Sequence, residues 1–271
     1  MLRSRLITAL VLAPIIVFGI LKLPPLWFAV AWGVVIFAAF WEWTDLAGLQ
    51  SRTARLGFVA VMLAGQLSAR YWAPYALDWL AWPVVVWWFA LGMALRTFPE
   101  TLLKIRYPAV LKAIIGLLVL LTAWIIMVWL RVNFGVKQVL FLLLLIWLAD
   151  AAAYFVGKRF GHTKLLPQIS PGKTVEGVYG ALFAAAAFAA AVGFYFEFKP
   201  IMISDFVVMS LLTVVISVAG DLFESLAKRL RGVKDSGVLF PGHGGVLDRI
   251  DSLTAAVSVF YLGSFLREIY L

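Results

Sequence analysis

Long apolar runs constrain this chain more than any other feature of its sequence. A transmembrane helix needs about 20 predominantly apolar residues to cross the hydrocarbon core of a bilayer. Residues 108–130, PAVLKAIIGLLVLLTAWIIMVWL, meet that requirement with a single lysine. Runs of this kind predict about nine spans, at residues 5–22, 25–41, 56–72, 75–95, 108–130, 138–156, 178–197, 201–220 and 254–270. The expected fold class is an all-α polytopic integral membrane protein.

The composition agrees with this prediction. Hydrophobic residues make up 64% of the chain and charged residues 14%, against about 45–50% and 25% in a soluble domain. The chain has no cysteine, which excludes disulfides and thiolate metal sites. No internal repeat or low-complexity linker divides it. We therefore expect a single membrane domain over 1–271, with N-terminal helices of uncertain role in 1–137 and further helices with cytoplasmic loops in 138–271.

Lysine and arginine predict the orientation, because cytoplasmic connections carry an excess of both. With a cytoplasmic N-terminus, 17 of the 23 lysines and arginines fall on the cytoplasmic side. We expect a multi-pass protein of the cell inner (plasma) membrane. Because the positive charge is distributed in this way along the chain, it does not indicate a nucleic-acid partner.

Two of the predicted cytoplasmic loops are more polar than orientation requires. The first is GKRFGHTKLLPQISPGKTVEG, from Gly157 to Gly177, and the second runs from the end of the eighth span through PGHGGVLDRIDS to Ser252. The second loop mixes carboxylates with cations, namely Asp221, Glu224, Asp235, Asp248 and Asp251 with Lys228, Arg229, Arg231, Lys234 and Arg249. A topology signal needs no carboxylates. Mixed charge among glycines indicates a site for a metal ion and phosphates.

The spacing of the carboxylates supports a metal site. Asp221, Glu224, Ser225 and Lys228 follow i, i+3, i+4, i+7 and would share a helix face, and Asp248 and Asp251 are spaced i, i+3. Hard oxygen ligands without cysteine favour Mg²⁺. We predict Asp221, Asp248 and Asp251 as its ligands. For Asp221 an ion pair to Lys228 or Arg229 is the alternative, and for Glu224 a solvated helix face.

The glycines predict a phosphate site in the same loop. Gly242, Gly244 and Gly245 permit positive φ and a close approach of backbone N–H groups to a phosphate. His243 is a candidate for a phosphate contact or a proton shuttle, with a packed or solvated histidine as the alternative.

The first loop contains PGKT, but it lacks the upstream glycine of a P-loop. Ser170, Lys173 and Thr174 are still candidate phosphate ligands, and Glu176 begins the next span. Asp150 and Tyr154, near the inner end of the sixth span, are a further polar pair. For Asp150 the alternative is helix–helix hydrogen bonding.

These motifs closely resemble one family. S-L-A-K-R at Ser225–Arg229, K-D-S-G at Lys234–Gly237 and P-G-H-G-G-V-L-D-R-I-D at Pro241–Asp251 are similar to the signature of the phosphatidate cytidylyltransferases, also called CDP-diacylglycerol synthases. G-D-L-x-E-S, D-x-x-A-Y-x-x-G-K-x-x-G and I-S-P-G-K-T-x-E-G extend the resemblance over about residues 145–271. Ala151 departs from the pattern, because a serine or threonine is commoner after the aspartate.

The resemblance implies that CTP and phosphatidate react to CDP-diacylglycerol and pyrophosphate, with Mg²⁺ as cofactor and a second, monovalent cation left open. It implies catalytic roles for Asp221, Lys228, Arg229, Lys234, Asp235, His243, Asp248, Arg249 and Asp251. Substrate-binding candidates are Asp150, Tyr154, Ser170, Lys173, Thr174, Glu176, Ser225, Gly244 and Gly245. The implied partners are CTP, phosphatidate, membrane lipids and a second copy of the chain in a homodimer. The active site is expected to face the cytoplasm.

Two other functions account for part of the pattern. An ion-coupled membrane transporter would also carry intramembrane aspartates, but it would not need the H-G-G-x-x-D-R-x-D loop. A CDP-alcohol phosphotransferase would share the metal, lipid and nucleotide, but its D-G-x-x-A-R series of aspartates is missing from this sequence.

Overall fold

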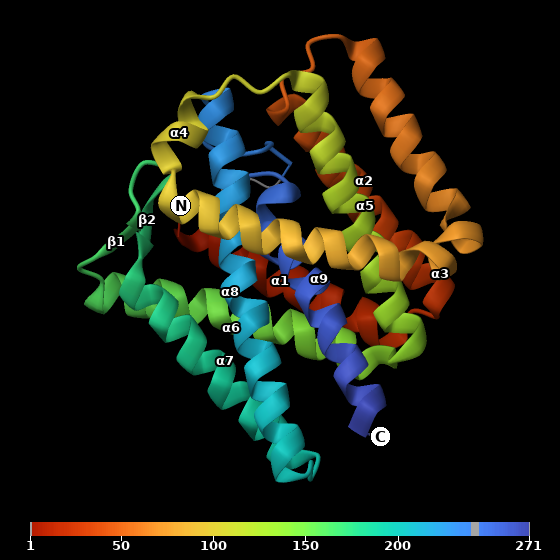
Figure 1. Cartoon of the computed structure of the whole chain (residues 1–271), viewed down its shortest axis with the longest axis vertical. Helices are drawn as coiled ribbons and strands as arrows, with labels where there is room; N and C mark the ends of the chain where they lie inside the picture. The colour runs from red at the N-terminus through yellow and green to blue at the C-terminus, as the bar shows by residue number, and fades with distance from the viewer. Residues whose placement is uncertain (1, 240–243, 271) are drawn as a thin grey trace. The chain divides into compact units, whose positions relative to one another are not determined.

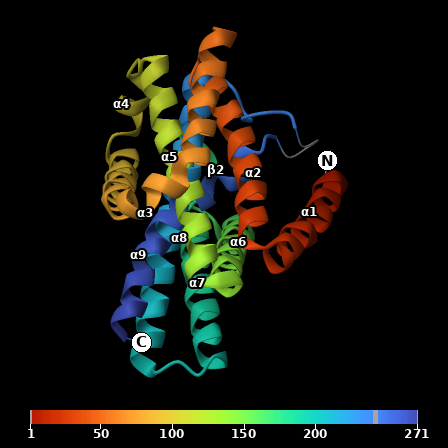
Figure 2. The same ribbon diagram turned by 90° about the vertical axis from the view of Figure 1, so that its right-hand side faces the viewer.

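The computed structural model describes residues 2–239 and 244–270, with side chains described for 11–73, 75–77, 79–239 and 244–263. Helices dominate these residues (Figures 1 and 2). In chain order the elements are α1 (Leu2–Lys22), α2 (Pro25–Leu46), α3 (Arg52–Thr97), α4 (Pro99–Lys104), α5 (Ala109–Asn133), α6 (Gly135–Phe160), β1 (Lys164–Leu166), β2 (Ser170–Thr174), α7 (Val175–Tyr195), α8 (Pro200–Arg231) and α9 (Leu247–Tyr270). The predicted helical membrane fold is confirmed.

Six segments among the described residues are long and apolar enough to cross a membrane: α2, residues 75–97 of α3, α5, α6, α7 and α8. Each matches one of the predicted spans. Residues 5–22, 56–72 and 254–270 are also helical, but within the described part of the chain they do not belong to this set. Their membrane crossing, the total of nine and the cytoplasmic N-terminus stay predictions.

Helix α3 differs from the prediction of two spans separated by a break. The backbone stays helical for 46 residues, which at 1.5 Å per residue is about 69 Å, roughly twice the hydrocarbon thickness. Position 74, where the break was expected, is a proline, and proline inside a helix often produces a kink without ending the helix.

The chain divides into two compact units, and the predicted single domain with its division at residue 137 stays a prediction. The first comprises Met1–Val84, Ile105–Leu140 and Leu226–Asp251, and the second Val85–Lys104, Phe141–Ser225 and Ser252–Leu271. The first unit therefore contains both the N-terminal helices and much of the polar loop that carries the family signature.

In the first unit, α2 packs in antiparallel fashion along α5. The indole N–H of Trp43 donates to the Lys112 carbonyl at 2.8 Å, and that of Trp124 donates to the Ala29 carbonyl at 3.0 Å. A β-carbon at Gly116 would collide with the ring of Trp43, so only glycine allows this approach. The contacts of Trp43 fix the C-terminal turn of α2, and that of Trp124 fixes its N-terminal half.

In the second unit, aromatic rings join four helices. Phe141 of α6 lies 5.2 Å from Phe188 of α7, 4.5 Å from Phe206 of α8 and 5.9 Å from Phe260 of α9, measured between ring centroids. Packing of this kind contributes both apolar burial and favourable ring geometry. It holds the helices that carry the first polar loop.

A short hairpin in that loop was not predicted. β1 and β2 pair antiparallel, with Lys164 opposite Thr174 and Leu166 opposite Ser170. The buried Ile169 closes the turn, because its N–H donates to the Leu166 carbonyl at 3.2 Å. Strands of three and five residues are too short to give a recognisable alternation of apolar and polar residues.

Candidate active site

The hairpin is tied to the helices on either side of it. Thr174 is buried and caps α7, because its hydroxyl oxygen accepts from the Gly177 N–H at 3.1 Å. Gly157 of α6 lies against it, since a β-carbon there would stand 2.8 Å from the Thr174 hydroxyl. Glu176 accepts from the Thr163 N–H with both carboxylate oxygens, at 3.0 and 3.2 Å. These partners favour structural roles for Thr174 and Glu176, and their contact with substrate stays a prediction.

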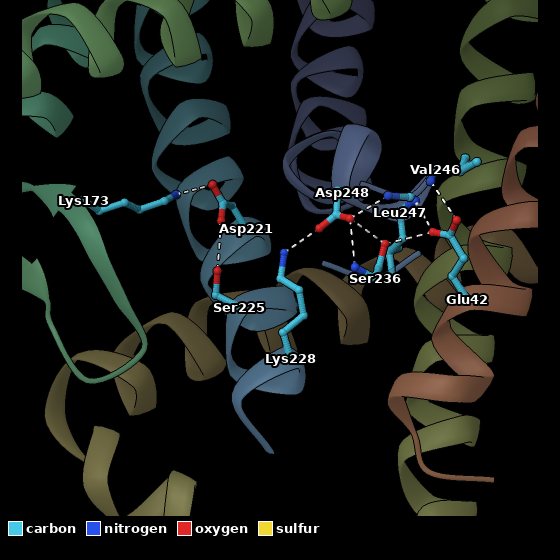
Figure 3. Close-up of polar contacts among 10 residues, drawn as sticks. Glu42, Lys173, Asp221, Ser225, Lys228, Ser236, Val246, Leu247 and Asp248 are labelled. Carbon is cyan, nitrogen blue, oxygen red and sulfur yellow. Dashed lines mark hydrogen bonds and ion pairs between the residues drawn. The ribbon is translucent and has the colours of Figure 1, made fainter. Parts of the chain in front are cut away.

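The anchored strand presents Lys173 to α8. The Lys173 Nζ lies 2.6 Å from Oδ2 of Asp221, and the Ser225 hydroxyl donates to Oδ1 at 3.3 Å (Figure 3). Both charged side chains are partly open to solvent, at 24% and 30% exposure. The structure thus brings together residues of the two predicted loops. The cation beside Asp221 comes from β2, whereas the sequence alternative named Lys228 or Arg229.

Asp248, in the first turn of α9, binds both a lysine and the preceding loop. Its Oδ1 accepts from Lys228 Nζ at 2.6 Å. Its Oδ2 lies 2.9 Å from the N–H nitrogen and the hydroxyl oxygen of Ser236 and accepts from the Gly245 N–H at 2.8 Å. This ion pair is drawn in Figure 3. The Asp248 and Lys228 side chains are 6% and 13% exposed, so the pair is well shielded from water.

The surroundings of Asp248 also set its charge. Burial alone would raise the pKa of the carboxyl, but the hydrogen bond and charge of Lys228 and the N–H groups of Gly245 and Ser236 lower it. The net result is a pKa below its ordinary value of 3.8. Asp248 is therefore an anion at neutral pH.

Glu42, near the end of α2, was not among the predicted site residues. Its Oε1 accepts from the Val246 N–H at 2.9 Å, and its Oε2 accepts from the Leu247 N–H and lies near the Ser236 hydroxyl, both at 2.9 Å. The N-terminal half carries no motif that identifies Glu42. The available signal was a carboxylate within an apolar helix, which is costly in a membrane and marks a candidate functional residue.

Of the predicted glycines that the structure describes, one has the positive φ that was expected. Gly244 has a φ of 77°, a conformation that suits glycine. Gly245 allows a close approach, but the approaching group is a protein carboxylate: a β-carbon there would collide with Oε2 of Glu42. Binding of phosphate by these residues stays a prediction, and Gly242 and His243 lie outside the described residues.

The sequence of the chain is matched along nearly its whole length by known proteins. Residues 3–266 fit the sequence model of the cytidylyltransferase family. The chain belongs to this family. The cytidylyltransferase is 41% identical to a phosphatidate cytidylyltransferase of Pseudomonas aeruginosa over 96% of each chain. A phosphatidate cytidylyltransferase of Haemophilus influenzae is 38% identical over 96% of this chain and 97% of its own length. One of Bacillus subtilis is 40% identical over 132 residues, 48% of each chain.

These matches confirm the predicted family and give no support to an ion-coupled transporter. They also cover the N-terminal helices, for which sequence analysis found no resemblance beyond hydrophobicity. In this cytidylyltransferase the remaining candidates are distributed over exposed positions: Asp150, Tyr154, Arg229, Lys234, Asp235 and Arg249 are exposed, while Ser170 and Asp251 are half-buried. Their roles stay predictions.

The donor chemistry of the cytidylyltransferase suits a hard cation. No group of three or more His, Cys, Asp or Glu side chains able to hold a metal occurs in residues 2–239 and 244–270. Asp221 and Asp248 each hold a lysine ammonium at 2.6 Å, so each already binds a cation through carboxylate oxygen, the donor that Mg²⁺ prefers. At Asp248 only Oδ1 is available for this, because Oδ2 is occupied by the loop.

Proposed function

We propose that this cytidylyltransferase transfers the cytidylyl group of CTP to phosphatidate and releases pyrophosphate, forming CDP-diacylglycerol. The observation that carries the proposal is the 41% identity, over 96% of both chains, with a protein named phosphatidate cytidylyltransferase. The apolar helices are long enough to cross a membrane, which is where a lipid substrate resides. The paired lysines and carboxylates give the charges that two polyanionic substrates require.

The chemistry needs charge compensation more than proton transfer. An oxygen of the phosphatidate phosphate forms a bond to the α-phosphorus of CTP, and the bond from that phosphorus to the bridging oxygen of the β-phosphate breaks. The attacking oxygen is already anionic, so no strong general base is required. Catalysis of this kind depends on orientation and on electrostatic stabilisation of the leaving pyrophosphate.

Lys173 and Lys228 are the residues best placed for this role. Each ammonium is held by a carboxylate, Lys173 by Asp221 and Lys228 by Asp248, so its position is defined before substrate binds. We propose that both lysines, with the exposed Arg249, bind phosphate oxygens. Mg²⁺, on the predicted ligands Asp221, Asp248 and Asp251, would neutralise charge on the leaving pyrophosphate.

We further propose that the enzyme is a homodimer of the inner membrane with its active site facing the cytoplasm, where a water-soluble nucleotide meets a lipid. The charge distribution supports this orientation, since 17 of 23 lysines and arginines lie on the predicted cytoplasmic side.

Pyrophosphate release from purified protein tests the proposal. The full-length chain in detergent micelles should release pyrophosphate from CTP only when phosphatidate is present, and equimolar CDP-diacylglycerol should form. Chelation with EDTA should stop the reaction, and added Mg²⁺ should restore it. Release without phosphatidate, or release without formation of the lipid product, would refute the assignment.

A further inference from the structure

Glu42 joins the N-terminal half of the chain to the signature loop. It lies on α2, more than 200 residues before Val246 and Leu247, whose N–H groups it accepts at 2.9 Å each. These three residues belong to the same compact unit. Figure 3 shows the Glu42 carboxylate pointing at the backbone where α9 begins.

The contact supplies α9 with a cap from another helix. The first N–H groups of a helix have no acceptor within it, and a carboxylate there satisfies them and interacts favourably with the helix dipole. Helix caps normally come from the residue just before the helix. Here Val246 is in that position and has no side-chain acceptor, while Glu42 accepts its N–H and that of Leu247.

Ser236 extends the contact from Glu42 to Asp248. Its hydroxyl oxygen lies 2.9 Å from Oε2 of Glu42 and 2.9 Å from Oδ2 of Asp248. A hydroxyl has one hydrogen and donates to one of these acceptors at a time. Asp248 in turn holds Lys228 at 2.6 Å. Glu42, Ser236, Asp248 and Lys228 therefore form a continuous chain of polar contacts in the first unit.

The loop leaves room for the Glu42 carboxylate. A β-carbon at Gly237 would collide with Oε1 of Glu42, and one at Gly245 would collide with Oε2. The neighbouring Trp43 is fixed by its hydrogen bond to α5, so α2 has little freedom to withdraw. The absence of a side chain at these two glycines therefore allows the Glu42 carboxylate to occupy its position in the loop.

We propose that Glu42 is a positioning residue for cytidylyl transfer. It fixes the start of α9 and Ser236, and through them the orientation of Asp248 and Lys228. This role rests on the function proposed above. A purely structural contact would affect only the stability of the protein. Loss of a positioning residue should also lower the kcat of the folded enzyme.

Glu42→Gln tests the role with minimal change in volume. The new amide nitrogen would face an N–H donor of Val246 or Leu247, so one cap bond is lost. We expect kcat to fall about 10- to 100-fold, the scale of a misplaced catalytic group, with less than about a threefold change in the KM of phosphatidate. Asp45→Asn is the matched control, because Asp45 lies on the same helix and is 47% exposed. It should keep wild-type kcat.

A double-mutant cycle separates positioning from stability. Ser236→Ala removes one hydrogen bond and should lower kcat about three- to tenfold. Combining it with Glu42→Gln should reduce kcat no further than Glu42→Gln alone, because the two residues act through the same contact. Wild-type kcat in either single variant, or losses that multiply, would overturn the proposal. If Glu42→Gln does not fold, Ser236→Ala decides the question by the same criterion.

Hydrogen–deuterium exchange tests the cap without reference to activity. The amide hydrogens of Val246 and Leu247 should exchange faster in Glu42→Gln than in the wild type. Their exchange rates in Asp45→Asn should equal those of the wild type. Unchanged exchange rates in Glu42→Gln would show that Glu42 does not cap α9, and this result would refute the proposal. Wild-type protein that makes no CDP-diacylglycerol would instead refute the proposed reaction, and this exchange measurement keeps the two failures distinct.

Discussion

Replacing Asp248 with asparagine removes the charge from a carboxylate that holds both a lysine and a loop. Asparagine keeps the shape but exchanges one acceptor oxygen for an NH₂ donor. In one orientation that donor faces the Lys228 ammonium, and in the other it faces the N–H groups of Ser236 and Gly245. Either orientation places the NH₂ group against other donors. The substitution therefore keeps the volume of the side chain but loses hydrogen bonds.

Burial determines the size of this effect. The Asp248 and Lys228 side chains are only 6% and 13% exposed, and removing one partner of a buried ion pair costs about 3–5 kcal/mol. Asp221 and Lys173 have the same 2.6 Å separation but are 30% and 24% exposed. Solvent screens that pair, so its loss should cost about 1 kcal/mol or less. The two aspartates, equivalent as predicted metal ligands, should differ clearly in their contribution to stability.

Reversible unfolding in mixed micelles, followed by far-ultraviolet circular dichroism, measures the difference. Asp248→Asn should lower the free energy of unfolding by several kcal/mol and abolish pyrophosphate release, while Asp221→Asn should abolish release with little loss of stability. Equal stability of the two variants would show that the Lys228 ion pair contributes nothing beyond a solvated one. Full activity of Asp248→Asn would remove that residue from the active site.

Three further predictions follow from charge and exposure. Because the pKa of Asp248 is lowered, its ion pair should stabilise the protein fully above about pH 4, the ordinary range of an aspartate, and lose that effect as the pH falls further. The stability difference between wild type and Asp248→Asn should therefore shrink in acid unfolding measurements. Cysteines at the exposed positions Thr163 and Val238 should react with a membrane-impermeant thiol reagent only after cells are permeabilised, and labelling of intact cells would reverse the orientation. Lys173→Ala should greatly reduce kcat, whereas Arg52→Ala, at the first residue of α3 on the predicted cytoplasmic side, should change it little; equal losses would indicate damage to insertion.

The helical membrane fold was predictable because a bilayer imposes a simple rule of length and hydrophobicity. The boundary between two spans was not, because Pro74 is compatible with either a loop or a bent helix, and the structure keeps α3 helical. The hairpin of β1 and β2 was missed for a different reason. Its strands are short, and its contacts depend on a fit between Gly157 and Thr174 that no periodic pattern indicates.

The candidate site was predictable where residues are clustered in sequence. Asp221, Ser225 and Lys228 are on one helix, as their spacing indicated, and Asp248 lies in the first turn of the next. The partners were not predictable, because Lys173 reaches Asp221 from a separate loop and Glu42 reaches α9 from the other half of the chain. Long-range contacts of this kind depend on tertiary packing, which spacing alone does not encode.

The two lysine–aspartate pairs suggest why the signature combines so many opposite charges. An isolated carboxylate at the edge of a membrane is costly, and a nearby ammonium offsets much of that cost before any ligand binds. The same ammonium can bind a phosphate oxygen when the carboxylate binds another cation. Lys173 and Lys228 would then stabilise the empty enzyme and bind its substrates in turn. At Asp248 the exchange would be restricted to Oδ1, because Ser236 and Gly245 hold Oδ2 in the loop. The loop can therefore keep its shape while Lys228 changes partners, which is the property that a site for two polyanionic substrates requires.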